Sequence, residues 1–170
     1  MTLIVCGLAE AAKVIAERRP SHMVSLLDPS SMIGTPAGMS PDRHLRLGVN
    51  DISAPTEGLV PPTEKVILDL LSFGRAWDET APMLVHCWAG ISRSTAAAFV
   101  IACDKSPRAD EREMALAMRR SSPHASPNRR IVALADDLLG RGGRMVEAID
   151  AMGDYSFIGA GQPFDFAARH

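Results

Sequence analysis

One cysteine and one arginine stand in a spacing that suits covalent chemistry on an anion: Cys87 and Arg93, with five residues between them. The apolar run Met83–Val85 just before Cys87 is typical of a buried strand, and the small residues of Ser94–Cys103 are typical of a helix. A loop between a strand and a helix N-terminus can turn several backbone N–H groups inward, where the helix dipole adds a positive field. The segment therefore predicts a cradle for a phosphate-like dianion.

Each residue type in this segment has a chemical role that the cradle would need. Cys87 is the predicted nucleophile, because the same positive field favours a thiolate over a thiol. The planar guanidinium of Arg93 can hold two phosphoryl oxygens at once, which the point charge of a lysine would do less well. Gly90 permits the turn, because a side chain there would crowd a loop whose backbone must approach the ligand closely or adopt a positive φ. Ser94 is placed to hydrogen-bond the sulfur and ease its departure when a phosphocysteine is hydrolysed.

The whole run from His86 to Ser94, HCWAGISRS, resembles the H-C-X-X-G-X-X-R-[ST] signature of the protein tyrosine phosphatase superfamily. The resemblance is specific at this motif, is weaker elsewhere, and covers residues 1 to about 140. The short chain is most similar to the dual-specificity-type and compact bacterial members. This resemblance implies hydrolysis of phosphomonoesters through a phosphocysteine, with no cofactor and no metal. The phosphate-binding loop would then comprise, besides Cys87 and Arg93, His86, Trp88, Ala89, Gly90, Ile91 and Ser92.

A phosphatase of this kind also needs a general acid that protonates the leaving oxygen, and Asp51 is the candidate. Asp51 begins the loop after the third predicted strand, and the acid of the superfamily lies on a loop in a similar place upstream of the cysteine. An Asx turn at the end of that strand is the other interpretation of Asp51. Glu57, in the same loop, is the alternative acid, whereas Asp28 and Asp42 bracket the preceding long loop and are interpreted as turn formers.

Several further residues are expected to support the site or the core. Asn128, in Ser126-Pro127-Asn128, resembles a short sequence after the catalytic core of dual-specificity members, and we expect it to cap a helix and brace the site. His86 is expected to hydrogen-bond the backbone around Cys87. Structural roles are favoured for His22, His44, His124, His170, Cys6 and Cys103, with a disulfide from one of the two cysteines to Cys87 left open. A secondary anion site is left open, beside a favoured helix-surface role, for Arg119, Arg120, Arg129 and Arg130.

Hydrophobic periodicity predicts an α/β domain. Strands are expected at Leu3–Cys6, His22–Leu27, Arg43–Val49 and Met83–Val85. Helices are expected at Glu10–Arg19, Thr63–Glu79, Ser94–Cys103, Met114–Arg120, Arg129–Leu139 and Arg144–Met152. This order indicates a central, mostly parallel sheet of about four to five strands flanked by helices, with a helical C-terminal half and the ligand site at the carboxyl end of the central strand. Residues 1–152 are interpreted as one domain, and residues 153–170, which include Phe157, Phe164 and Phe166, as a tail that docks on it.

The composition fits one soluble globular domain, because the 170 residues are 46% apolar and 22% charged, with a formal net charge of −2. This slight acidity gives no support for a nucleic-acid or membrane partner, and the first residues predict neither a signal peptide nor a membrane span. Three cysteines without a C-x-x-C pair fit a reducing cytoplasm. We therefore expect a cytoplasmic enzyme whose substrate is a phosphorylated protein or peptide and whose loop can also hold phosphate or sulfate.

The absence of added positive charge between Cys87 and Arg93 favours the ring of phosphotyrosine over polyanionic lipids, and tyrosine-only and dual specificity both stay open. A catalytically silent phosphate-binding or adaptor protein is the first alternative. It would follow if Asp51 lay far from the loop without a substitute. Sulfur transfer in a rhodanese-like domain is a third hypothesis. The His86-Cys87 pair and the Arg93-Ser94 pair at the end of the motif favour the phosphatase over it.

Overall fold

A five-stranded sheet forms the centre of the protein in the computed structural model, which describes residues 1–156 and 158–170. Its strands are β1 (Thr2–Gly7), β2 (His22–Leu27), β3 (His44–Gly48), β4 (Met83–Cys87) and β5 (Phe164–Ala167). The strand order is β3-β2-β4-β1-β5, and all neighbours are parallel except β1 and β5. Cys87 therefore ends the central strand, and the predicted α/β class with a mostly parallel sheet is confirmed.

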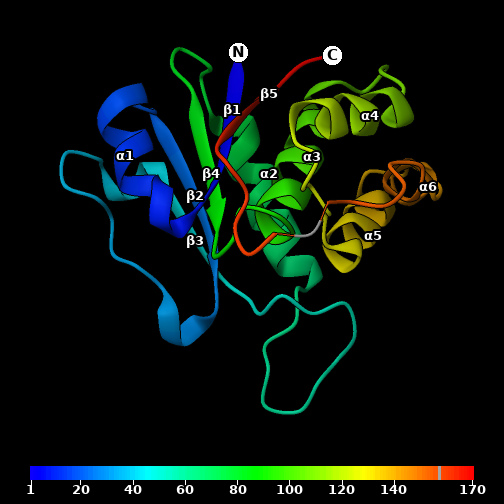
Figure 1. The fold of residues 1–170 in the computed structure, drawn as a ribbon, viewed down its shortest axis with the longest axis horizontal. Helices are drawn as coiled ribbons and strands as arrows, with labels where there is room; N and C mark the ends of the chain where they lie inside the picture. Colours follow the sequence, from blue (N-terminus) through cyan, green and yellow to red (C-terminus); the bar gives the residue numbers. More distant parts are fainter. Residues whose placement is uncertain (157) are drawn as a thin grey trace.

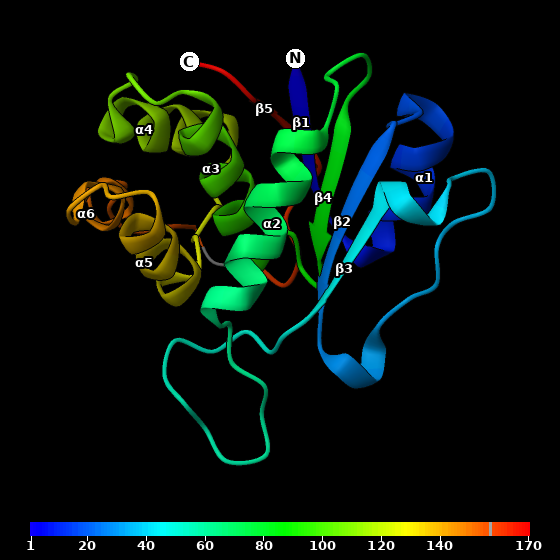
Figure 2. The same ribbon diagram turned by 180° about the vertical axis from the view of Figure 1, so that it is seen from behind.

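Helices cover both faces of the sheet, which is why β2 and β4 are buried along their whole length (Figures 1 and 2). One face carries α1 (Leu8–Arg18), which packs on Ile4, Met23 and Leu84. The other face carries α2 (Glu64–Ala76), α3 (Arg93–Lys105), α4 (Glu111–Ser121), α5 (Arg129–Leu138) and α6 (Arg144–Asp150). Every residue of α3 from Arg93 to Cys103 is buried, so the alanines of this helix let the sheet and the outer helices approach closely.

Two long loops begin at the carboxyl ends of β2 and β3, the same edge of the sheet at which β4 ends (Figure 1). The first follows β2 and contains short 3-10 turns at Pro29–Ser31 and Pro41–Arg43. The second follows β3 and spans residues 49–63, where Asn50 closes its base through backbone and side-chain hydrogen bonds to Val60, each 2.8 Å long. These loops place the polar side chains that directly follow β2 and β3, namely Asp28, Asn50 and Asp51, beside the end of β4.

The segment after α6 returns to the sheet, and its residues 164–167 form β5 beside β1. The sequence pattern predicts a docked tail here but no strand. Phe164 and Phe166 are buried, while Asp165 points outward and pairs with Arg18 of α1 at 3.0 Å, which is the alternation of a strand. Phe157, the other phenylalanine of this tail, lies outside the described residues.

No helix within the described ranges combines the length and the apolar character that crossing a membrane requires.

Candidate active site

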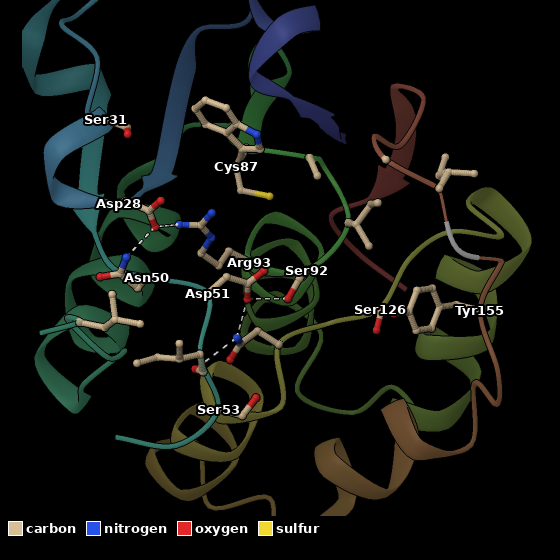
Figure 3. A pocket seen from close by; sticks show the side chains of 18 residues that line it. Asp28, Ser31, Asn50, Asp51, Ser53, Cys87, Ser92, Arg93, Ser126 and Tyr155 are labelled. Atoms are coloured by element: carbon tan, nitrogen blue, oxygen red, sulfur yellow. Dashed lines mark hydrogen bonds and ion pairs between the residues drawn. The ribbon is translucent and has the colours of Figure 1, made fainter. Parts of the chain in front are cut away.

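The loop between β4 and α3 closes around the sulfur of Cys87. The backbone N–H of Gly90 donates to Cys87 Sγ over 3.3 Å, and Ser94 Oγ lies 3.2 Å from the same sulfur. The Cys87 side chain is buried on its other sides, and Figure 3 shows its sulfur directed into the pocket. An amide and a hydroxyl that can both donate to sulfur stabilise a thiolate, so the local geometry suits the nucleophile that the sequence predicts.

Gly90 is the residue that allows the loop to lie directly on the end of β1. Its φ is 73°, in the left-handed region, and a Cβ at this position would lie 2.6 Å from the backbone of both Cys6 and Gly7. Leu8 N also donates to Trp88 O over 3.1 Å, which ties the start of α1 to the loop. Any side chain at residue 90 must therefore displace the loop or the end of β1.

We expect Gly90→Ala to lower the free energy of unfolding by about 2–4 kcal/mol, because alanine would carry both an unfavourable φ and a backbone clash. Gly58→Ala is the matched control, since Gly58 has a φ of 75° but a Cβ there would meet nothing within 4 Å. That variant should lose only about 1 kcal/mol. Urea unfolding measures both values, and equal losses in the two variants would contradict the tight contact at Gly90.

Arg93 begins α3 with its guanidinium buried in the site. Arg93 Nη1 donates to Asp28 Oδ1 over 2.9 Å and to the carbonyl of Val49 over 2.8 Å. Arg93 Nε is also buried, and it has no hydrogen-bond partner among the described residues. One part of the guanidinium is thus held by the protein, while Nε is a buried donor that the described residues leave without an acceptor.

Asp28 begins a turn, as the sequence predicts, because its backbone carbonyl accepts from Ser31 N over 2.9 Å. Its carboxylate belongs in addition to this site, which the sequence analysis did not predict. Its Oδ1 accepts hydrogen bonds from Arg93 and from Asn50 Nδ2, the latter over 2.9 Å, and it makes no side-chain cap to the 3-10 turn that follows. One signal in the sequence could have found it. Asp28 directly follows a predicted parallel strand, and the carboxyl ends of such strands meet at the ligand site.

Asp51 lies against the phosphate-loop candidate, as Figure 3 shows. Its Oδ1 accepts hydrogen bonds from Ser92 Oγ over 2.7 Å and from Asn128 Nδ2 over 2.8 Å. Asn128 also caps α5, because its Oδ1 accepts from Ile131 N over 3.1 Å. The structure therefore brings Asp51, Ser92 and Asn128 together, whereas Glu57 is exposed and is not among the residues that line the pocket.

A cavity of about 740 Å³ opens above Cys87. Its charged lining residues, among those described, are one cation and two carboxylates: Arg93, Asp28 and Asp51. Large exposed apolar side chains stand at its rim, namely Trp88 (59% exposed), Leu59 (41%) and Tyr155 (42%). They come from three separate segments, so the sequence pattern alone does not group them.

The wall that contains Tyr155 was not predicted, and it is built by the segment between α6 and β5. Gly161 N donates to Ala89 O over 2.7 Å, and Ser156 N donates to Pro123 O over 3.1 Å. A Cβ at residue 161 would lie 3.2 Å from Gly90 O, so this segment runs directly over the loop. The C-terminal tail thus supplies one side of the pocket.

The other two cysteines differ from Cys87 in environment. Burial raises the pKa of Cys6 and of Cys103 to about 12, so both remain thiols near neutral pH. Cys6 packs in the cluster on the α1 side of the sheet, and Cys87 packs in the core on the α3 side. A disulfide between Cys6 and Cys87 would therefore need the sheet to rearrange.

Three of the four arginines near Asn128 are engaged with the protein itself, and Arg120 is exposed. Arg119 Nη1 donates to Pro123 O over 2.8 Å, and Arg130 Nε donates to Pro62 O over 2.8 Å. Arg129 pairs with Asp150. These contacts hold loops against α4 and α5 and fit the helix-surface role that the sequence favours.

Comparison with known proteins agrees with this architecture. No protein-family model matches the chain, and no curated protein matches it. The crystal structure of DUSP15 matches 88% of this chain and 89% of its own, with a TM-score of 0.58 and 19% identity. The phosphatase domain of Yvh1 from Chaetomium thermophilum matches 84% of this chain and 93% of its own, with a TM-score of 0.56 and 21% identity. The chain thus has the fold of dual-specificity-type protein tyrosine phosphatases, as the signature implied.

Proposed function

We propose that this protein is a cysteine-dependent phosphomonoester hydrolase that acts on phosphotyrosine in proteins or peptides. The observation that carries the proposal is the convergence of three groups on one pocket: the hydrogen-bonded sulfur of Cys87, the buried donor Nε of Arg93, and the carboxyl of Asp51. The fold of its structural neighbours supports a phosphatase.

In the first step, the Cys87 thiolate attacks phosphorus in line with the leaving oxygen. The P–S bond forms as the P–O bond breaks, while loop amides and Arg93 bind the three equatorial oxygens. Asp51 gives its proton to the leaving oxygen. Both hydrogen bonds to Asp51 end on Oδ1, which leaves Oδ2 to carry that proton.

In the second step, water attacks the phosphocysteine and transfers a proton to the Asp51 carboxylate. The P–S bond breaks, and the sulfur leaves as a thiolate that accepts a hydrogen bond from Ser94. Ser92 and Asn128 hold the Asp51 carboxyl in place for this step, because both donate hydrogen bonds to its Oδ1. No group outside this chain, the substrate and water is required.

The pocket rim supports an aryl phosphate as substrate. Trp88 and Tyr155 offer aromatic faces, and Leu59 adds an apolar contact, so a phosphotyrosine ring and its flanking residues would gain dispersion and stacking contacts. A polyanionic inositol phosphate would instead meet two carboxylates and one arginine. Turnover of phosphotyrosyl peptide, phosphoseryl peptide, inositol phosphate and thiosulfate tests this function, and a higher kcat/KM on any of the last three would refute it.

We expect Trp88→Ala and Tyr155→Ala each to raise KM for a phosphotyrosyl peptide about 3- to 10-fold, the worth of one aromatic contact. Neither should change kcat much on a small aryl phosphate, because neither side chain touches the reacting atoms in the mechanism above. Leu68→Ala is the control, since Leu68 is an exposed apolar residue of α2 outside the pocket lining. Steady-state kinetics with both substrates measures the effects, and unchanged KM values would remove the rim from substrate recognition.

The binding-protein alternative depended on an Asp51 distant from the loop. Ser92 Oγ lies 2.7 Å from Asp51 Oδ1, so the geometry favours a complete set of catalytic groups.

A further inference from the structure

A chain of buried polar side chains runs beneath the phosphate-loop candidate. Thr35 Oγ1 lies 3.1 Å from His44 Nδ1, His44 Nε2 lies 2.8 Å from Ser25 Oγ, and Ser25 Oγ lies 2.6 Å from His86 Nε2. Ser25, His44 and His86 are buried, and the last of them immediately precedes Cys87. These contacts link the loop after β2 to the end of β4 across three strands.

These side chains lie on the α1 side of the sheet. Along β2 and β4, the flanking residues Val24, Leu26, Val85 and Cys87 belong to the core on the α3 side, and strand side chains alternate between faces. Polar groups buried in such a sheet are costly unless each is hydrogen-bonded. The chain of hydrogen bonds meets that condition for Ser25 and His44 and holds the His86 ring at Nε2.

Proton counting restricts the roles of the two histidines. Burial lowers the pKa of His86 to about 4 and also lowers the pKa of His44, so both rings are neutral at pH 7. The Ser25 hydroxyl has one proton and can donate to one ring only, so the other ring must donate its Nε2–H to Ser25. His44 and His86 must therefore be opposite tautomers.

The two nitrogens of His86 are held differently. Ser25 Oγ lies 2.6 Å from His86 Nε2, whereas His86 Nδ1 is buried and has no hydrogen-bond partner among the described residues. Ser25 is therefore the contact that fixes the orientation of the His86 ring.

We propose that Ser25 and His44 are positioning residues for Cys87, which act by holding the ring of His86, and with it the end of β4, at the start of the phosphate loop. The proposal rests on the proposed phosphatase chemistry of Cys87. The loop that carries Thr35 also carries Asp28, the partner of Arg93, so one loop orients both ends of the motif. Hydrogen bonds in such a chain polarise one another, so loss of one of them also weakens the hydrogen bond to His86 at the end of the chain.

Alkylation by iodoacetate tests the proposal without any turnover. Cys6 and Cys103 stay protonated thiols near neutral pH, so the reaction there reports on Cys87. In Ser25→Ala, the pH of half-maximal alkylation should rise by about 0.5 to 1 unit, the effect of one hydrogen bond, and kcat should fall about 3- to 10-fold with little change in KM. Ser25→Thr, which keeps the hydroxyl, should restore both values.

Ser21→Ala is the matched control, because Ser21 Oγ pairs with His22 Nδ1 at 2.9 Å in a second Ser-His pair that does not reach His86. Equal alkylation profiles in Ser25→Ala and Ser21→Ala would overturn the proposal. Since Ser25→Ala can fail to fold, nitrogen NMR of the wild-type imidazoles gives a second test. We expect one of the two rings, His44 or His86, to carry its proton on Nε2 and the other on Nδ1, and the same tautomer in both rings would overturn the proposal. A wild type that alkylates as expected but does not hydrolyse aryl phosphate would refute only the proposed function.

Discussion

Cys87→Ser is expected to abolish turnover of an aryl phosphate while the protein still binds inorganic phosphate. A serine hydroxyl at this position is protonated at neutral pH and is a weak nucleophile, so kcat should fall by at least about 10⁴-fold. The groups that would bind the oxygens, Arg93 and the loop amides, are unchanged by this substitution. Phosphate should therefore protect the variant against thermal unfolding nearly as well as it protects the wild type.

Cys103→Ser provides the control for the loss of a buried thiol. Cys103 is buried in α3 and does not line the pocket, so its substitution should affect stability more than kcat. Single-turnover kinetics with rapid quench would in addition trap the phosphocysteine in the wild type. Undiminished hydrolysis by Cys87→Ser would refute the covalent mechanism. If the variant lost both hydrolysis and phosphate binding, the substitution would have damaged the loop.

The second large effect concerns pH and Asp51. The mechanism needs a thiolate and a neutral acid together, so kcat/KM on an aryl phosphate should be bell-shaped on the acid side of neutrality. The rising limb reflects formation of the thiolate and the second ionisation of the substrate, near ~6. The falling limb reflects loss of the proton that Asp51 must donate, so it should flatten in Asp51→Asn. The rate of that variant should drop about 10²- to 10⁴-fold for a phenol of high pKa, and much less for an activated leaving group that needs no proton.

Glu57→Gln separates the two candidate acids. Glu57 lies in the same loop but outside the pocket lining, so we expect its substitution to leave the falling limb and the rate intact. The opposite pattern, with an intact limb in Asp51→Asn and a lost limb in Glu57→Gln, would make the assignment of Asp51 wrong and leave the cysteine chemistry in place. If neither substitution changed the falling limb or the rate, the result would support the alternative of a catalytically silent phosphate-binding protein.

The loop around Cys87 could be predicted from the sequence, because its residues are contiguous in the chain. Strand, loop and helix follow one another from Met83 to Lys105, so the spacing of Cys87, Gly90 and Arg93 predicts the loop from local sequence. The place of Asp51 in the site could also be predicted from the sequence, because Asp51 follows a strand of a parallel sheet and the carboxyl ends of such strands meet at one edge. The alternation of strands and helices likewise predicted the α/β class.

The contacts between distant segments needed the folded chain. Hydrophobic period tells which face of its own element a residue occupies, but not which strand or loop becomes its neighbour. The pairing of Asp28 with Arg93, the link from Ser25 to His86, and the return of the tail to form β5 and the Tyr155 wall all join residues far apart in sequence. Sequence by itself thus determined the chemistry of the loop, and only the tertiary structure decided which polar and aromatic side chains surround it, because strand order sets those neighbours and no local pattern encodes strand order.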